Sequence, residues 1–120
     1  MLNPFIKERL ENVLDHILTI AVYFTDIRQT ADFTILPDGK KSFDAILSRL
    51  QALGENFKKI EKLQPGFTKE NISKDIEKII KFRDFISHHY EKLDIDIIFE
   101  ICRDDIPELT IAVKKFLHLL

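Results

Sequence analysis

Four side chains that could bind phosphate and move protons lie close together in this sequence of 120 residues. They are Arg83, Asp84, His88 and Tyr90. A guanidinium holds a phosphate through a planar fork of N–H donors, and an imidazole with a pKa near neutrality can accept and release protons. The segment therefore has the side chains for proton transfer beside a bound phosphate, with a phenol next to them.

Helical geometry limits how these side chains can meet. At 100° per residue, Arg83 and Tyr90 fall within about 20° of one another, whereas His88 lies about 140° from Arg83. One straight helix cannot aim all three at one point. Either the helix ends near His88 so that the chain can turn, or a second subunit completes the site.

A structural role would also account for these residue types. Arg83 would then form a surface ion pair, and a charged His88 would stabilise the C-terminus of a helix through the helix dipole. Tyr90 would be half buried. The spacing alone leaves this alternative open.

The chain is predicted to begin with a helix. Asn3 can cap it, and Pro4 fits its first position because the missing N–H would have no partner there. Apolar residues recur at three- and four-residue intervals as far as Ile27, and no Gly or Pro interrupts the chain before the turn at residues 36–40.

A second amphipathic helix is predicted over residues 42–63. Gly54 lies inside it at a cost of about 1 kcal/mol relative to Ala, so either another helix approaches closely there or the glycine is simply tolerated. A third helix, capped by Thr68 or Asn71, leads into the segment that contains Arg83.

The C-terminal quarter is predicted to be helical as well. Asp94 can cap a helix whose residues 95–102 are apolar on nearly all sides, which suggests a subunit interface. A break is expected near Asp104, followed by a last helix. No stretch alternates as a strand does, so the sequence predicts one all-α domain over residues 1–120, an antiparallel bundle of four or five helices.

Composition and missing motifs exclude several classes of protein. With 45% hydrophobic and 32% charged residues the chain should fold, and no apolar run could cross a membrane or act as a secretion signal. Cys102 is the single cysteine, so no disulfide within the chain is expected. A cytoplasmic location is expected for the same reason. Glycine-rich phosphate loops, hydrolase elbows and zinc motifs are absent, and neither a metal nor a cofactor is expected. His16 and His118 are predicted to be solvated.

Charge bears on the possible partners. A net charge of −2 gives no global attraction to nucleic acid. Between residues 74 and 92, five basic side chains are nearly balanced by four acidic ones. Any contact with RNA must therefore be local, at a compact phosphate site.

The segment resembles a motif of the HEPN superfamily, in particular of the HepT-like toxins that are paired with minimal nucleotidyltransferases. That motif is Arg, four to six residues, His, any residue and Tyr, with a polar residue preferred after Arg. Arg83, Asp84, His88 and Tyr90 occupy these places. Residues 50–56, 94–100 and 104–109 also resemble family segments, whereas Glu91-Lys92-Leu93 stands where relatives commonly have a Gly.

The resemblance implies a helical homodimer whose two motifs face one another and form a metal-independent endoribonuclease. The ribose 2′-hydroxyl would attack the neighbouring phosphate, with His88 in proton transfer and Arg83 on the phosphate. Paired subunits would supply two imidazoles, one as base and one as acid. Asp84 would orient Arg83 or His88, or else form only an ion pair within the helix.

The resemblance also implies regulation. Tyr90 would accept AMP groups from a cognate nucleotidyltransferase, which acts as the antitoxin in a type VII-like toxin–antitoxin module. His89 would have no role of its own. Two alternatives stay open: a non-catalytic helical subunit that serves a minimal nucleotidyltransferase, and a plain dimeric scaffold.

Overall fold

The computed structural model describes residues 2–88 and 94–118. These residues are helical, with no strand among them, so the predicted all-α fold is confirmed. The elements in chain order are α1 (Pro4–Phe24), the 3₁₀ turn η1 (Thr30–Thr34), α2 (Asp38–Leu63), α3 (Phe67–Asn71), α4 (Ile76–His88), α5 (Ile95–Glu100), the π-helical turn η3 (Ile101–Asp105) and α6 (Ile106–Phe116).

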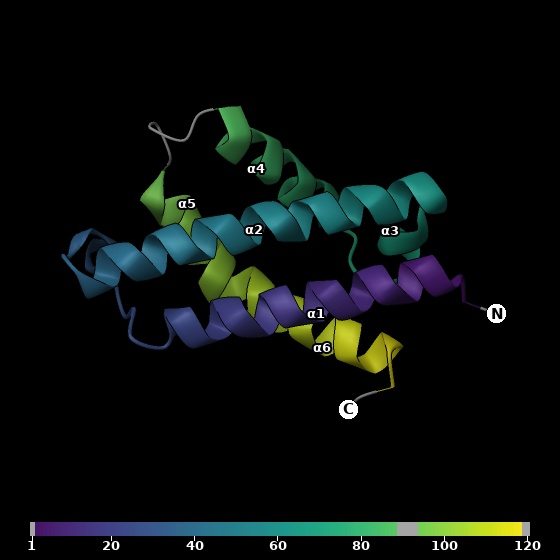
Figure 1. The fold of residues 1–120 in the computed structure, drawn as a ribbon, viewed down its shortest axis with the longest axis horizontal. Helices are drawn as coiled ribbons and strands as arrows, with labels where there is room; N and C mark the ends of the chain where they lie inside the picture. Colours follow the sequence, from purple (N-terminus) through teal and green to yellow (C-terminus); the bar gives the residue numbers. More distant parts are fainter. Residues whose placement is uncertain (1, 89–93, 119–120) are drawn as a thin grey trace.

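The two long helices, α1 and α2, lie side by side and run in opposite directions (Figure 1). α4 packs on α2, and α6 packs on α1. Apolar residues spaced three or four apart on each helix meet in one core. Its fully buried members include Ile6, Leu10, Val13, Ile17 and Ile20 of α1 and Ile46, Leu53, Phe57 and Ile60 of α2. α2 is therefore the helix that both α1 and α4 contact.

α1 begins as predicted and ends earlier. The Oδ1 atom of Asn3 accepts the backbone N–H of Phe5 at 2.8 Å. The helix ends at Phe24, although the apolar pattern continues to Ile27 and no Gly or Pro follows before residues 36–40. The expectation of a longer first helix was wrong.

The chain leaves α1 because η1 provides other partners for its backbone. The Asp32 carboxylate accepts the backbone N–H groups of Arg28 and Gln29 at 2.9 and 3.2 Å. Phe33 is buried, and its ring centroid lies 5.1 Å from that of Phe43 on α2. A side-chain cap and an aromatic contact therefore end the helix.

The predicted third helix is divided into α3 and α4. Gly66 precedes α3 with a φ of 85°, and the carbonyl of Thr68 accepts N–H groups from both Ile72 and Ser73. Ser73 Oγ then accepts the N–H of Asp75 at 3.1 Å, just before α4. Neither Thr68 nor Asn71 caps the helix that carries Arg83, so that part of the prediction was wrong.

The C-terminal helices are continuous. Asp94 Oδ1 accepts the N–H of Asp96 at 2.9 Å, which confirms the predicted cap of α5. The break or fresh start expected near Asp104 takes the form of η3: the chain stays helical, but α-helical hydrogen bonding gives way to a π-helical turn, and α6 then starts at Ile106. Ile97 is 40% exposed while Ile98 is fully buried, so this monomer covers only part of the apolar segment. None of the described helices is both long and apolar enough to cross a lipid bilayer.

The cap by Asp32 gives a test of η1. The backbone N–H of Arg28, aided by that of Gln29, lowers the pKa of Asp32 below its usual 3.8. A lowered folded-state pKa contributes stability that is present above the ordinary value and is lost as the pH falls through the folded one. Asp32→Asn should therefore melt at a lower temperature than the wild type at pH 7, and the difference should shrink on acidification below 3.8.

Asp26→Asn, a change of the same charge at an exposed position in the same connection, is the control and should have no comparable effect. Equal melting temperatures of Asp32→Asn and wild type at pH 7 would contradict this account of the end of α1.

Candidate active site

Arg83 lies directly on the backbone of α2. A Cβ atom added at Gly54 would overlap the Cβ of Arg83 and would lie 2.7 Å from its Cγ. Gly54 is therefore required for the close approach of α4, which was one of the two explanations that the sequence left open. The glycine is where the side-chain stem of Arg83 crosses α2.

The guanidinium of Arg83 lies between two carboxylates. Its Nη2 atom is 2.8 Å from Oε2 of Glu55, and its Nη1 atom is 2.9 Å from Oδ1 of Asp84. The side chain of Arg83 is 23% exposed, so these contacts are partly shielded from water. A planar fork held at two of its nitrogens has a defined orientation.

Asp84 contacts two cations. Its Oδ1 atom accepts from Arg83 Nη1 and lies 3.5 Å from Nζ of Lys58 on α2. The hydrogen bond from Arg83, with a further contribution from Lys58, lowers the pKa of Asp84, so its carboxylate is ionised at neutral pH. The sequence left two roles open for Asp84, an ion pair within the helix and a hydrogen bond that orients Arg83. The contact with Arg83 Nη1 is both of these at once.

Sequence reasoning did not single out Glu55 or Lys58. They lie three residues apart and so on one side of α2, and both contact residues of α4. Two indirect signals marked this part of α2: the suspected close approach of another helix at Gly54, and the resemblance of residues 50–56, which include Glu55, to a family segment.

The other two predicted site residues are described less fully. α4 is helical through His88, so backbone positions 83 and 88 are separated by about 140° around the helix axis. The description of His88 is limited to its backbone, and Tyr90 lies outside the described residues. The structure thus brings together Arg83 and Asp84 of the predicted set.

The sequence predicted that His16 is solvated, but its side chain is only partly exposed. It is partly buried between α1 and α2, with Nδ1 3.1 Å from Nη1 of Arg49. Burial, followed by the charge of Arg49, lowers the pKa of His16. Arg49 also contacts Asp15 at 3.3 Å. His118 is exposed, as expected.

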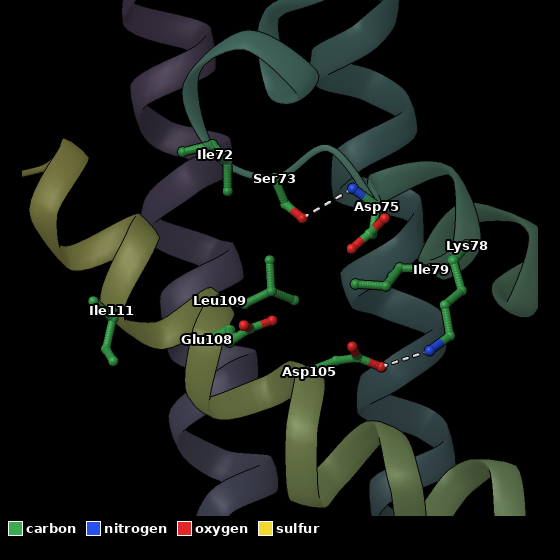
Figure 2. A pocket seen from close by; sticks show the side chains of 9 residues that line it. All are labelled: Ile72, Ser73, Asp75, Lys78, Ile79, Asp105, Glu108, Leu109 and Ile111. Carbon is green, nitrogen blue, oxygen red and sulfur yellow. Dashed lines mark hydrogen bonds and ion pairs between the residues drawn. The ribbon is translucent and has the colours of Figure 1, made fainter.

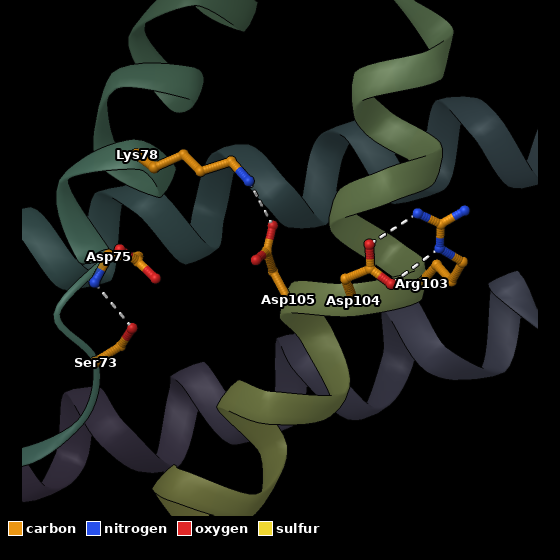
Figure 3. Close-up of polar contacts among 6 residues, drawn as sticks. All are labelled: Ser73, Asp75, Lys78, Arg103, Asp104 and Asp105. Carbon is orange, nitrogen blue, oxygen red and sulfur yellow. Dashed lines mark hydrogen bonds and ion pairs between the residues drawn. The ribbon is translucent and has the colours of Figure 1, made fainter.

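A separate hollow of about 370 Å³ lies between the start of α4 and α6 (Figure 2). Asp75, Asp105 and Glu108 line it, together with Lys78, and Lys78 pairs with Asp105 at 3.1 Å (Figure 3). Arg103 pairs with its neighbour Asp104 in the same view. Within residues 2–88 and 94–118, no group of three or more His, Cys, Asp or Glu could hold a metal ion. Of the predicted site residues with described side chains, neither Arg83 nor Asp84 lines this hollow.

A groove of about 700 Å³, lined by charged and apolar side chains, lies between α4 and α5. The rings of Phe82 and Phe85 stack there with centroids 6.5 Å apart, and Ile97 and Ile101 line the other side. Phe85 and Ile97 are each 40% exposed. Apolar surface is therefore accessible on the monomer within two residues of Arg83.

The described residues thus form an α-helical protein in which a guanidinium is held between two carboxylates at a helix crossing, with a lysine beside it. Comparison with known families gives a more specific assignment. Residues 10–116 match the family described as Ribonuclease HepT-like, and the chain belongs to this family of the HEPN superfamily. The resemblance inferred from the motifs is thereby confirmed, and a ribonuclease type of function is supported. No curated protein and no solved structure matches the chain.

The packing at Gly54 can be tested by Gly54→Ala. Alanine is the better helix former by about 1 kcal/mol, but its Cβ has no room, and overpacking of this kind costs roughly 1–3 kcal/mol. The variant should therefore be less stable than wild type in urea unfolding, although propensity alone predicts a gain.

A second experiment combines Gly54→Ala with Arg83→Gly in a double variant and compares its stability with that of the two single variants. Glycine at position 83 removes the atoms that the new Cβ would meet, so the double variant should lose less stability than the sum of the two single losses. Strictly additive losses would show that the two positions are not in contact.

Proposed function

We propose that this chain is a metal-independent endoribonuclease of the toxin type, with Arg83, Asp84 and His88 as its catalytic residues. The observation that carries the proposal is the Arg83 guanidinium, held between Glu55 and Asp84 where α4 crosses α2, in a chain of the Ribonuclease HepT-like family. RNA is its substrate, and the cytoplasm is its location.

Cleavage proceeds by attack of the ribose 2′-hydroxyl on the adjacent phosphorus. A base removes the 2′-hydroxyl proton, the P–O5′ bond breaks, and an acid protonates the departing 5′ oxygen. Arg83 stabilises the negative charge that develops on the phosphoryl oxygens, and Asp84 fixes the orientation of the guanidinium. The products carry a 2′,3′-cyclic phosphate and a 5′-hydroxyl.

The active unit is a homodimer in which each subunit contributes His88 to a shared cleft, one imidazole as base and the other as acid. Two features support this arrangement. Positions 83 and 88 are about 140° apart on α4, so a single subunit does not aim both at one phosphate. The half-exposed groove around Phe85 and Ile97 also leaves apolar surface that a second copy would cover.

A cognate minimal nucleotidyltransferase neutralises the toxin by transferring AMP to the hydroxyl of Tyr90. The support is the position of Tyr90 in the family motif, two residues after His88. Each adenylate adds bulk and a negatively charged phosphodiester next to a site that receives an RNA phosphate. Both effects block the substrate.

A non-catalytic helical subunit of such a nucleotidyltransferase is the alternative. One observation favours it: Glu55 and Asp84 already offset the charge of Arg83, which reduces the attraction of the site for an anion. In that case the chain would bind its partner and would leave RNA intact.

Cleavage can be tested with purified protein, RNA and excess chelator. Wild type should produce 2′,3′-cyclic phosphate ends, whereas His88→Ala should be slower by roughly 100-fold or more because proton transfer is lost. Arg83→Ala should also be strongly impaired. Glu8→Gln, an exposed change on α1, is the control and should cleave like wild type. Cleavage by His88→Ala and Arg83→Ala at the wild-type rate would rule out the proposed site.

Modification can be tested by intact mass after co-expression with the proposed cognate minimal nucleotidyltransferase. Wild type should gain AMP-sized increments that Tyr90→Phe does not gain. The chain has one other tyrosine, so Tyr23→Phe, at a 40% exposed position on α1, is the matched control and should still be modified. Increments that persist in Tyr90→Phe would place the acceptor elsewhere.

Expression without the partner separates the toxin from the alternative. Growth arrest that His88→Ala relieves is the expected result for a ribonuclease. Unimpaired growth with the wild-type chain would favour the non-catalytic subunit.

A further inference from the structure

Two cations from different helices meet at a single oxygen atom. Oδ1 of Asp84 is 2.9 Å from Nη1 of Arg83 and 3.5 Å from Nζ of Lys58. An anionic oxygen between a guanidinium and an ammonium group has the surroundings that a phosphoryl oxygen requires. The side chains of Arg83 and Lys58 therefore both reach one anionic oxygen.

We propose that Lys58 is a second phosphate-binding cation of the active site, which exchanges the Asp84 carboxylate for a phosphoryl oxygen of the bound RNA. The proposal rests on the proposed RNA substrate and extends the site from α4 to α2. Arg83 keeps its contacts with Glu55 and Asp84, while Lys58 moves.

The two cations differ in how firmly they are held. Arg83 is 23% exposed and makes contacts of 2.8 and 2.9 Å, which are typical distances for charge-assisted hydrogen bonds. The Lys58–Asp84 distance of 3.5 Å is longer, and these two side chains are 36% and 45% exposed. A long, partly exposed ion pair of this kind contributes little stability, so an incoming phosphate can replace it.

The local charges also require a second cation. Without Lys58, a phosphodiester that approached Arg83 would meet one positive charge flanked by the carboxylates of Glu55 and Asp84. With Lys58 the site has two positive charges, which balance the two negative charges of Glu55 and Asp84. The long flexible stem of Lys58 lets the ammonium group shift from the carboxylate to a neighbouring oxygen without a change in the helix.

The arrangement follows from the spacing on α2. Glu55 and Lys58 are three residues apart and so project from one side of the helix, on either side of the place where Arg83 and Asp84 pack. One side of α2 thus supplies Glu55, which holds the guanidinium of Arg83, and Lys58, which would bind the same phosphate.

The test measures binding to an RNA oligonucleotide with 2′-O-methyl groups throughout, which lacks the attacking hydroxyl and cannot be cleaved. Fluorescence anisotropy gives the dissociation constant over a range of KCl concentrations for wild type and Lys58→Met, which keeps most of the stem and loses the charge. We expect binding about tenfold weaker at about 0.1 M KCl. The salt dependence should fall by about 0.7 in the logarithmic slope, as for the loss of one phosphate contact.

Two variants serve as controls. Lys59→Met removes the same charge at the next, exposed position of α2 and should bind within about twofold of wild type. Lys58→Arg keeps the charge and should retain most of the affinity. Lys58→Met with the affinity and salt slope of Lys59→Met would overturn the proposal, as would a wild-type protein that does not bind the oligonucleotide.

Cleavage of unmodified RNA separates this proposal from the proposed function. If wild type cleaves and Lys58→Met cleaves and binds equally well, the assignment of Lys58 fails and the ribonuclease stands. If wild type binds through Lys58 but does not cleave, the ribonuclease fails and the phosphate contact stands.

Discussion

The contact between Arg83 and Gly54 is the constraint on which the candidate site depends. Because position 54 has no Cβ, the stem of Arg83 can lie on the backbone of α2, and only then does the guanidinium reach Glu55 at 2.8 Å. A larger residue would separate α4 from α2 and lengthen this contact. The chain accepts a weaker helix former in the middle of α2, at about 1 kcal/mol, in return for that proximity.

The ion pairs around Arg83 have more to do with geometry than with stability. Partly shielded pairs lose much of their attraction to desolvation, so their net contribution to folding is small. In the proposed site they provide a guanidinium whose orientation is set before a substrate arrives, which would avoid reorganisation when charge develops on a phosphate. Lys58 is partly exposed and pairs with Asp84 at the longer distance of 3.5 Å, so in the proposed site it can follow a ligand.

The sequence predicted those parts of the fold that local patterns determine. Apolar spacing predicted the helices, and Asn3 and Asp94 act as the caps they were expected to be. Arg83 and Asp84 were found because their types and spacing form a motif. The end of α1 was missed because Asp32 and Phe33, several residues further on, determine it through a cap and an aromatic contact. Glu55 and Lys58 were missed because their partners lie on another helix, and helical spacing does not report which residues meet across a crossing.

Net charge explains why the site must be compact. With a charge of −2 the protein has no long-range field that would draw RNA to it, so affinity must come from contacts at short range. In the proposed site Lys58, beside the guanidinium of Arg83, would provide such a contact, and the carboxylates of Glu55 and Asp84 cancel the field of the two cations a few ångströms away. Because its contacts are short-range, a site of this kind binds a phosphate only when the rest of the RNA also fits the protein surface around the site. In the proposed homodimeric ribonuclease, the shape of the paired subunits, more than the total charge, would then determine which RNA is cut.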